Sequence, residues 1–117
     1  MKLVELIKNG IKIGGMHWNV EVVESDLYEG EKLGLTDYCN THIFIRKTQS
    51  EDRMIETLLH ELIHVALFHA GIDEHDESLI NALSHNLLSL MRQNSELFDY
   101  IIHSSASSLF SSGKTES

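Results

Sequence analysis

The chain has 117 residues, a formal net charge of −9, and 42% hydrophobic and 23% charged residues. This length and balance are typical of one soluble globular domain with a modest core. The negative charge argues against nucleic acids or anionic membranes as partners, because both require a basic surface. Cys39 is the single cysteine, which excludes an internal disulfide and predicts a free thiol in a reducing, cytoplasmic compartment. The N-terminal apolar run is interrupted by Glu5 and Lys8, so we expect neither a signal peptide nor a membrane span there.

Up to about Lys47 the pattern is that of short strands separated by turns that contain glycine or asparagine. Apolar and polar residues alternate from Met16 to Val22, which is the period of a half-buried strand. Gly14-Gly15 can turn this strand back on residues 11–13, and further strands are predicted over 35–38 and 41–46. We therefore expect a small antiparallel sheet.

After Lys47 the apolar spacing becomes helical. Residues 48–51 have the composition of a capping box, and residues 51–70 are apolar on nearly every side, which predicts a buried helix. Gly71 is the expected end of this helix, and Asp73 or Asp76 can cap a second long helix that ends near Asn94. A short third helix over 96–103 completes an α+β fold. We predict one domain over residues 1–103 and a flexible serine-rich tail over 104–117.

The predicted buried helix contains the sequence His60-Glu61-Leu62-Ile63-His64, an H-E-x-x-H motif. Residues four apart lie on one face of a helix, so both imidazoles can bind one ion. Glu61 lies about 100° around the helix from His60, where its carboxylate can accept a proton from an attacking water. Chance produces such a motif in roughly one shuffled chain in twenty of this composition. However, burying two imidazoles and a carboxylate without partners costs several kcal/mol, which favours a metal site.

A catalytic zinc ion usually takes three protein ligands, and this helix supplies two of them. The residues after Gly71 can return over the site, and they include two candidates for the third ligand, Glu77 and His75. Glu77 would open the second helix with its side chain facing the first. His75, just before that helix, is the alternative ligand.

Other polar residues of the chain have less defined predicted roles. His69 is nine residues from His60, about 180° around the helix, so it should point away from the metal. His85 is expected to pair with Glu61 or to be a polar group on the flank of the second helix. Three residues are possible stabilisers of an oxyanion, although a structural role is favoured for each: Tyr38, His17 and His42.

Residues 56–67, Gly71 and residues 77–84 together resemble ImmA/IrrE-type metallopeptidases. They look most similar to the short versions that are common in phages and mobile elements. The step Gly34-Leu35-Thr36-Asp37 is similar to a G-x-T-D-like step near the start of those proteins. The resemblance covers about residues 16–99.

This resemblance implies a minimal zincin-like domain, with the small sheet packed on the H-E-x-x-H helix. It implies a Zn²⁺ ion held by His60, His64 and Glu77, with Glu61 as the catalytic base. It also implies a protein or peptide substrate, such as a transcriptional repressor. A substrate strand could pair with the strand over 41–46 if that strand lies at the sheet edge.

Three other functions compete with a zinc peptidase. The chain could be a non-catalytic, metal-stabilised protein that binds a host or phage regulator. It could be an SprT-like metalloprotease, which uses a histidine as third ligand, but the association of that group with DNA fits poorly with a charge of −9. It could also be a helical module without metal. The intact H-E-x-x-H motif favours catalysis.

Overall fold

A computed structural model describes residues 2–24, 32–47 and 49–104 of the chain. The elements are α1 (Leu3–Ile7), β1 (Ile11–Ile13), β2 (Met16–Val23), β3 (Gly34–Asp37), β4 (His42–Arg46), α2 (Glu51–His69), α3 (Glu77–Gln93) and α4 (Ser95–His103). The α+β class is confirmed. The chain divides into two compact units, and the boundary falls within α3, between Asn86 and Leu87. The single domain expected over 1–103 stays a prediction, and the expected tail lies, from residue 105 on, outside the described residues.

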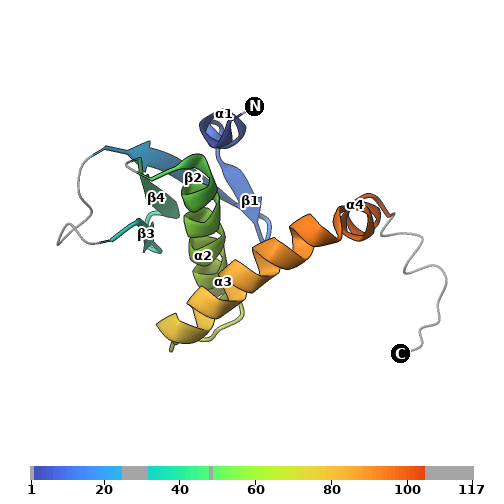
Figure 1. Cartoon of the computed structure of the whole chain (residues 1–117). Coiled ribbons are helices and arrows are strands. Elements are labelled where there is room, and N and C mark those ends of the chain that lie inside the picture. Colours follow the sequence, from blue (N-terminus) through green and yellow to red (C-terminus); the bar gives the residue numbers. More distant parts are fainter. Residues whose placement is uncertain (1, 25–31, 48, 105–117) are drawn as a thin grey trace. The chain divides into compact units, whose positions relative to one another are not determined.

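The four strands form one mixed sheet in the order β1-β2-β4-β3 (Figure 1). The β1–β2 and β3–β4 pairs are antiparallel, as expected, but β2 and β4 are parallel. The prediction of a fully antiparallel sheet is therefore wrong at this pair. The physical reason is burial. Ile43 and Ile45 of β4 are completely buried, so β4 lies in the interior of the sheet, next to β2, and β3 lies at the edge. The order therefore places β4, and not β3, beside β2.

The core of the first unit lies between this sheet and the helices α1 and α2. The parallel register places Val20 opposite Ile43, so side chains from both strands face the same side of the sheet. Eight buried side chains form the cluster: Leu3, Ile7, Trp18, Val20, Ile43, Ile45, Met54 and Val65. Each such apolar side chain stabilises the fold by about 1.5–3 kcal/mol.

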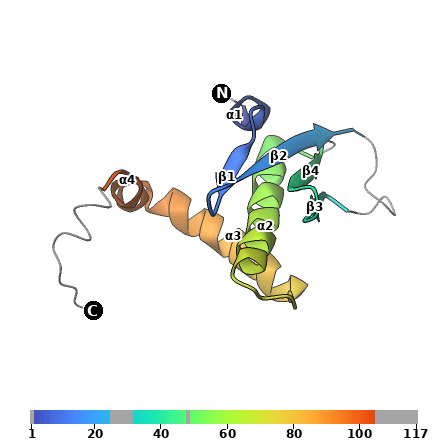
Figure 2. The same cartoon turned by 180° about the vertical axis from the view of Figure 1, so that it is seen from behind.

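The helix α1 was not predicted, and it lies beside the first turn of α2 (Figures 1 and 2). Its Leu3 backbone N–H donates to Glu51 Oε2 at 2.7 Å. Ser50 caps α2 by accepting from the Arg53 N–H at 3.2 Å, so the capping box expected over 48–51 is not the cap that forms. Glu51 instead accepts the hydrogen bond that connects α1 to α2, the helix that carries the H-E-x-x-H motif.

The end of α2 is a Schellman motif at Gly71, which has φ +82°. The Ile72 N–H donates to the Leu67 carbonyl at 2.9 Å, and the Gly71 N–H donates to the Phe68 carbonyl at 3.0 Å. A glycine is favoured here because this positive φ strains other residues. The motif reverses the chain and returns residues 72–76 along α2.

The second unit comprises the end of α3 and α4, and none of the α4 residues is buried. None of the helices in the described ranges has the length and hydropathy needed to cross a bilayer. Cys39 is a free thiol, and it is exposed.

Candidate metal centre

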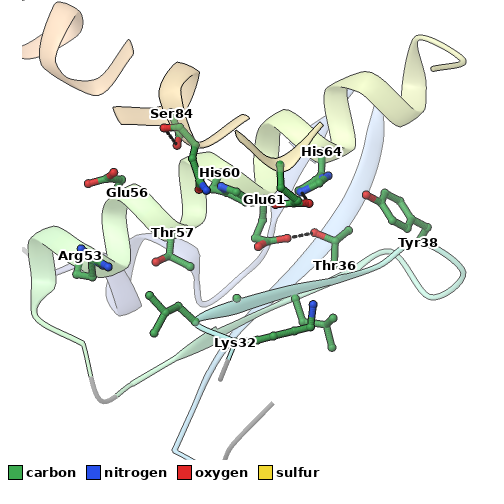
Figure 3. Close-up of a pocket in the computed structure, with 15 residues that line it drawn as sticks. Lys32, Thr36, Tyr38, Arg53, Glu56, Thr57, His60, Glu61, His64 and Ser84 are labelled. Carbon is green, nitrogen blue, oxygen red and sulfur yellow. Dashed lines mark hydrogen bonds and ion pairs between the residues drawn. The ribbon is translucent and has the colours of Figure 1, made fainter. Parts of the chain in front are cut away.

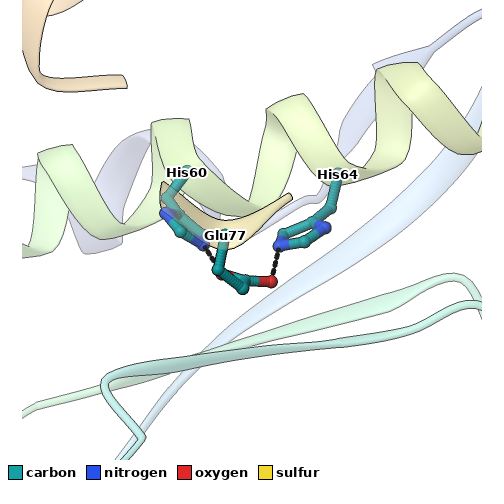
Figure 4. Close-up of side chains that lie close together, drawn as sticks. All are labelled: His60, His64 and Glu77. Atoms are coloured by element: carbon teal, nitrogen blue, oxygen red, sulfur yellow. Dashed lines mark hydrogen bonds and ion pairs between the residues drawn. The ribbon is translucent and has the colours of Figure 1, made fainter. Parts of the chain in front are cut away.

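Three side chains from two helices converge beside α2 (Figure 4). Glu77 Oε1 lies 3.0 Å from His60 Nε2, and Glu77 Oε2 lies 2.9 Å from His64 Nε2. One ligand atom from each residue lies within 4.8 Å of the others, so this group could hold a metal ion. The helical spacing of four brings the two rings together, with their centroids 5.0 Å apart.

Glu77 reaches this position because Asp76 begins α3. Asp76 Oδ1 accepts from the Ser78 and Leu79 N–H groups at 3.0 and 3.3 Å, which makes Asp76 the N-cap and Glu77 the first helical residue. Of the two caps expected from sequence, Asp76 is the one that forms. Ile80 is almost completely buried, which anchors the first turn of α3.

The chemistry of the donor set fits zinc. Two imidazole nitrogens and one carboxylate form the ligand set of many catalytic zinc sites. Ligands around a tetrahedral zinc ion stand about 3.3–3.5 Å apart, so the three side chains need only small movements to admit one. Burial lowers the pKa of His64, which favours the neutral imidazole that metals bind.

Glu61 is buried beside this group and is held from β3. Thr36 Oγ1 donates to Glu61 Oε1 at 2.5 Å (Figure 3). Burial raises the pKa of Glu61, and the Thr36 hydrogen bond opposes that rise. Thr36 pairs with Ile43 and Gly34 with Ile45, so both β3 residues face α2 with the core isoleucines.

Gly34 leaves the space that the Glu61 side chain occupies. A Cβ at residue 34 would lie 2.8 Å from Glu61 Oε2 and 2.7 Å from Thr57 Cγ2. The strand predicted from sequence over 35–38 begins after Gly34, and no role was predicted for Thr36. The glycine just before this predicted strand is the signal that could have indicated the contact, since a glycine in a strand often marks a place where another group approaches the backbone closely.

A cleft of about 710 Å³ lies over the centre, and its lining includes residues 32–36, His60, Glu61, His64 and Glu77. Of the three possible oxyanion stabilisers, Tyr38 lines the cleft and its hydroxyl points into it (Figure 3). Burial and the carboxylates of Glu61 and Glu77 raise the pKa of Tyr38. The other two lie elsewhere, His17 beside Asn19 and His42 stacked on Phe44.

The remaining histidines lie outside the converging group. His69 packs against Trp18, with ring centroids 6.1 Å apart, and points away from the centre as expected. His85 Nδ1 lies 3.4 Å from Glu56 Oε2, so it is a polar group on the helix flank and not a partner of Glu61. His75 is adjacent to the His64 ring but is not one of the three converging residues.

The comparisons with known proteins agree with this geometry. The model of the IrrE N-terminal-like domain, peptidase family M78, matches residues 16–106. No curated protein and no solved structure matches the chain. The family match spans most of the chain, and it includes the H-E-x-x-H helix, Glu77 and the β3 residues that hold Glu61. The resemblance found in the sequence is thus confirmed, and the chain belongs to the IrrE N-terminal-like domain family of metallopeptidases.

Proposed function

We propose that the chain is a zinc-dependent peptidase in which His60, His64 and Glu77 bind the metal and Glu61 is the catalytic base. The observation that carries this proposal is the convergence of the three donors beside a buried carboxylate, inside one cleft. His60, Glu61 and His64 are buried or half-buried, whereas Glu77 is exposed. A helical module without metal would have little reason to place the first three inside, because burying such polar groups without a ligand is costly.

The residues of the chain have distinct parts in the reaction. A bound zinc ion would polarise the scissile carbonyl and acidify the attacking water. Glu61 accepts a proton from that water and donates it to the leaving amine. The Thr36 hydrogen bond at 2.5 Å holds one oxygen of Glu61, which orients the carboxylate while leaving its other oxygen available.

The substrate backbone pairs with the open edge of β3 in this proposal. The strand over 41–46 could hold the peptide only if it lay at the sheet edge, but β4 lies between β2 and β3. Among the described strands, β3 has a neighbour on one side only, and Leu33 to Thr36 line the cleft. An extended peptide on this edge would receive backbone hydrogen bonds and pass directly over Glu61.

The decisive experiment compares zinc content and peptide cleavage in the natural chain and in Glu61→Gln. Zinc-loaded protein is incubated with a library of peptides, and the products are identified by mass spectrometry. We expect Glu61→Gln to retain zinc while kcat/KM falls by at least about 10²-fold. Zinc binding with no cleavage by the natural chain would favour the non-catalytic binding protein. Loss of zinc in Glu61→Gln would mean that Glu61 is a ligand.

A regulatory protein, such as a phage or host repressor, is the substrate that we propose on the basis of the family resemblance. The net charge of −9 supports a protein substrate over a protein–DNA complex. Incubating the zinc-loaded chain with a repressor encoded beside it, with and without operator DNA, tests this point. An uncut repressor under both conditions would contradict the substrate assignment and leave the peptidase proposal intact.

A further inference from the structure

His75 contacts the side of the His64 ring opposite the metal ligand atom. His64 Nδ1 and His75 Nδ1 are 2.7 Å apart, and the ring centroids are 4.9 Å apart. The second nitrogen of His75, Nε2, lies 2.8 Å from the backbone carbonyl oxygen of Ile72. These contacts form a continuous line from a backbone carbonyl to His64 Nε2, which faces Glu77.

The direction of each hydrogen bond in this line is determined by chemistry. A carbonyl oxygen only accepts, so His75 Nε2 must carry the hydrogen. In a neutral imidazole the other nitrogen then has a lone pair, so His75 Nδ1 accepts. The short contact between the two Nδ1 atoms therefore requires His64 Nδ1 to donate. His64 Nε2 is left with its lone pair directed toward the metal centre.

We propose that His75 is a positioning residue that holds His64 in the Nδ1–H tautomer and so prepares His64 Nε2 as a zinc ligand. This inference rests on the proposed metal site. It replaces the earlier alternative of His75 as the third ligand, because both His75 nitrogens are engaged away from Glu77. Outer partners of this kind fix the orientation of ligand histidines and increase their basicity.

The loop after α2 builds this arrangement. The Schellman motif at Gly71 sets the direction of the Ile72 backbone, whose carbonyl accepts from His75. Tyr38 also contacts the His75 ring edge-on, with centroids 6.4 Å apart. Within the described residues, the only hydrogen-bond partner of the His60 ring is Glu77. The protein thus sets the tautomer of one zinc ligand by a side chain and a backbone group that are three residues apart.

The first test is the zinc affinity of substituted chains, measured by competition with a chromogenic chelator. His75→Phe keeps an aromatic ring but removes the acceptor, so we expect about 10- to 100-fold weaker zinc binding. His75→Asn places an oxygen near the position of His75 Nδ1 and should restore most of the affinity. The exposed His85, changed to Phe, is the matched control and should bind zinc like the natural chain.

The second test reads the tautomers directly in the natural, zinc-loaded chain by long-range ¹H–¹⁵N NMR of the imidazoles. We expect a hydrogen on His64 Nδ1 and on His75 Nε2. A His75 resonance shifted by direct zinc coordination, or a hydrogen on His75 Nδ1, overturns the proposal even if His75→Phe does not fold. Unchanged affinity in a folded His75→Phe chain overturns it too. His60→Ala separates the two proposals: if it leaves zinc affinity unchanged, the metal site itself is wrong.

Discussion

Gly34→Ala is the substitution that most directly tests how β3 holds the catalytic carboxylate. The added methyl would lie 2.7 Å from Thr57 Cγ2, 2.8 Å from Glu61 Oε2 and 3.1 Å from Glu61 Cγ. The first two separations are shorter than the normal contact of a methyl carbon with a carbon or an oxygen atom, so a side chain or the strand must move by several tenths of an ångström. Thr57 cannot yield freely, since it is buried and its Oγ1 donates to Gln49 Oε1 at 2.7 Å.

Two separate effects of Gly34→Ala follow from these contacts. Overpacking against Thr57 should lower the free energy of unfolding by about 1–3 kcal/mol. Displacement of the Glu61 carboxylate by up to about 1 Å should lower kcat/KM by about 10²-fold. Zinc affinity should change little, because the clash involves none of the three proposed ligands.

The assay measures urea unfolding, zinc affinity and peptide cleavage on the same preparations. Adding Thr57→Ser removes the Cγ2 atom, so the double variant should regain stability while its activity stays low, since the contact with Glu61 remains. Gly34 lies outside the region of positive φ, so the steric contacts of the new methyl group, and not backbone strain, cause both effects. Natural kcat/KM in folded Gly34→Ala would refute the role that we assign to this glycine.

Three further predictions concern the neighbours of the centre. Thr36→Val removes the donor to Glu61 but keeps the side-chain volume, so kcat/KM should fall about 10-fold with zinc affinity unchanged; an equal loss of both would indicate a folding defect. Asp76→Ala removes the α3 cap, so the free energy of unfolding should fall by about 1 kcal/mol. Zinc binding should also weaken, because the cap positions Glu77; unchanged zinc affinity in a chelator competition would contradict this link. Removing zinc with a chelator should lower Tm, since an ion at 100 times its Kd stabilises the folded chain by about 2.7 kcal/mol, whereas His60→Ala should show no such zinc-dependent shift.

The long helices could be predicted because their signals are local. The apolar period over α2, the glycine at its end and the acidic cap of α3 all act within a few residues. The pairing of β2 with β4 could not be predicted in this way, because it joins strands separated by β3 and depends on which strand buries most. The pattern suggested hairpins between consecutive strands, and this holds only for β1–β2 and β3–β4.

The candidate centre shows the same division between local and long-range information. The positions of His60 and His64 on one face follow from helical geometry alone. Glu77 entered as one of two candidates, and the family resemblance favoured it. The contact between Thr36 and Glu61 joins residues 25 positions apart and depends on the register of β3 against α2, which no local pattern encodes. His75 was predicted near the site as the alternative third ligand, and its contact with the far side of the His64 ring could not be read from sequence spacing.

The small helix α1 has a practical consequence for any attempt to isolate the peptidase domain. The family match begins at residue 16, yet Leu3 and Ile7 are part of the core and Leu3 donates to the first turn of α2. Deleting these two side chains would remove about 3–6 kcal/mol of apolar burial, a large fraction of the 5–15 kcal/mol that typically stabilises a domain. Expression clones trimmed to the matched region should therefore yield aggregated or protease-sensitive protein, and boundaries for this domain should be set upstream of Leu3.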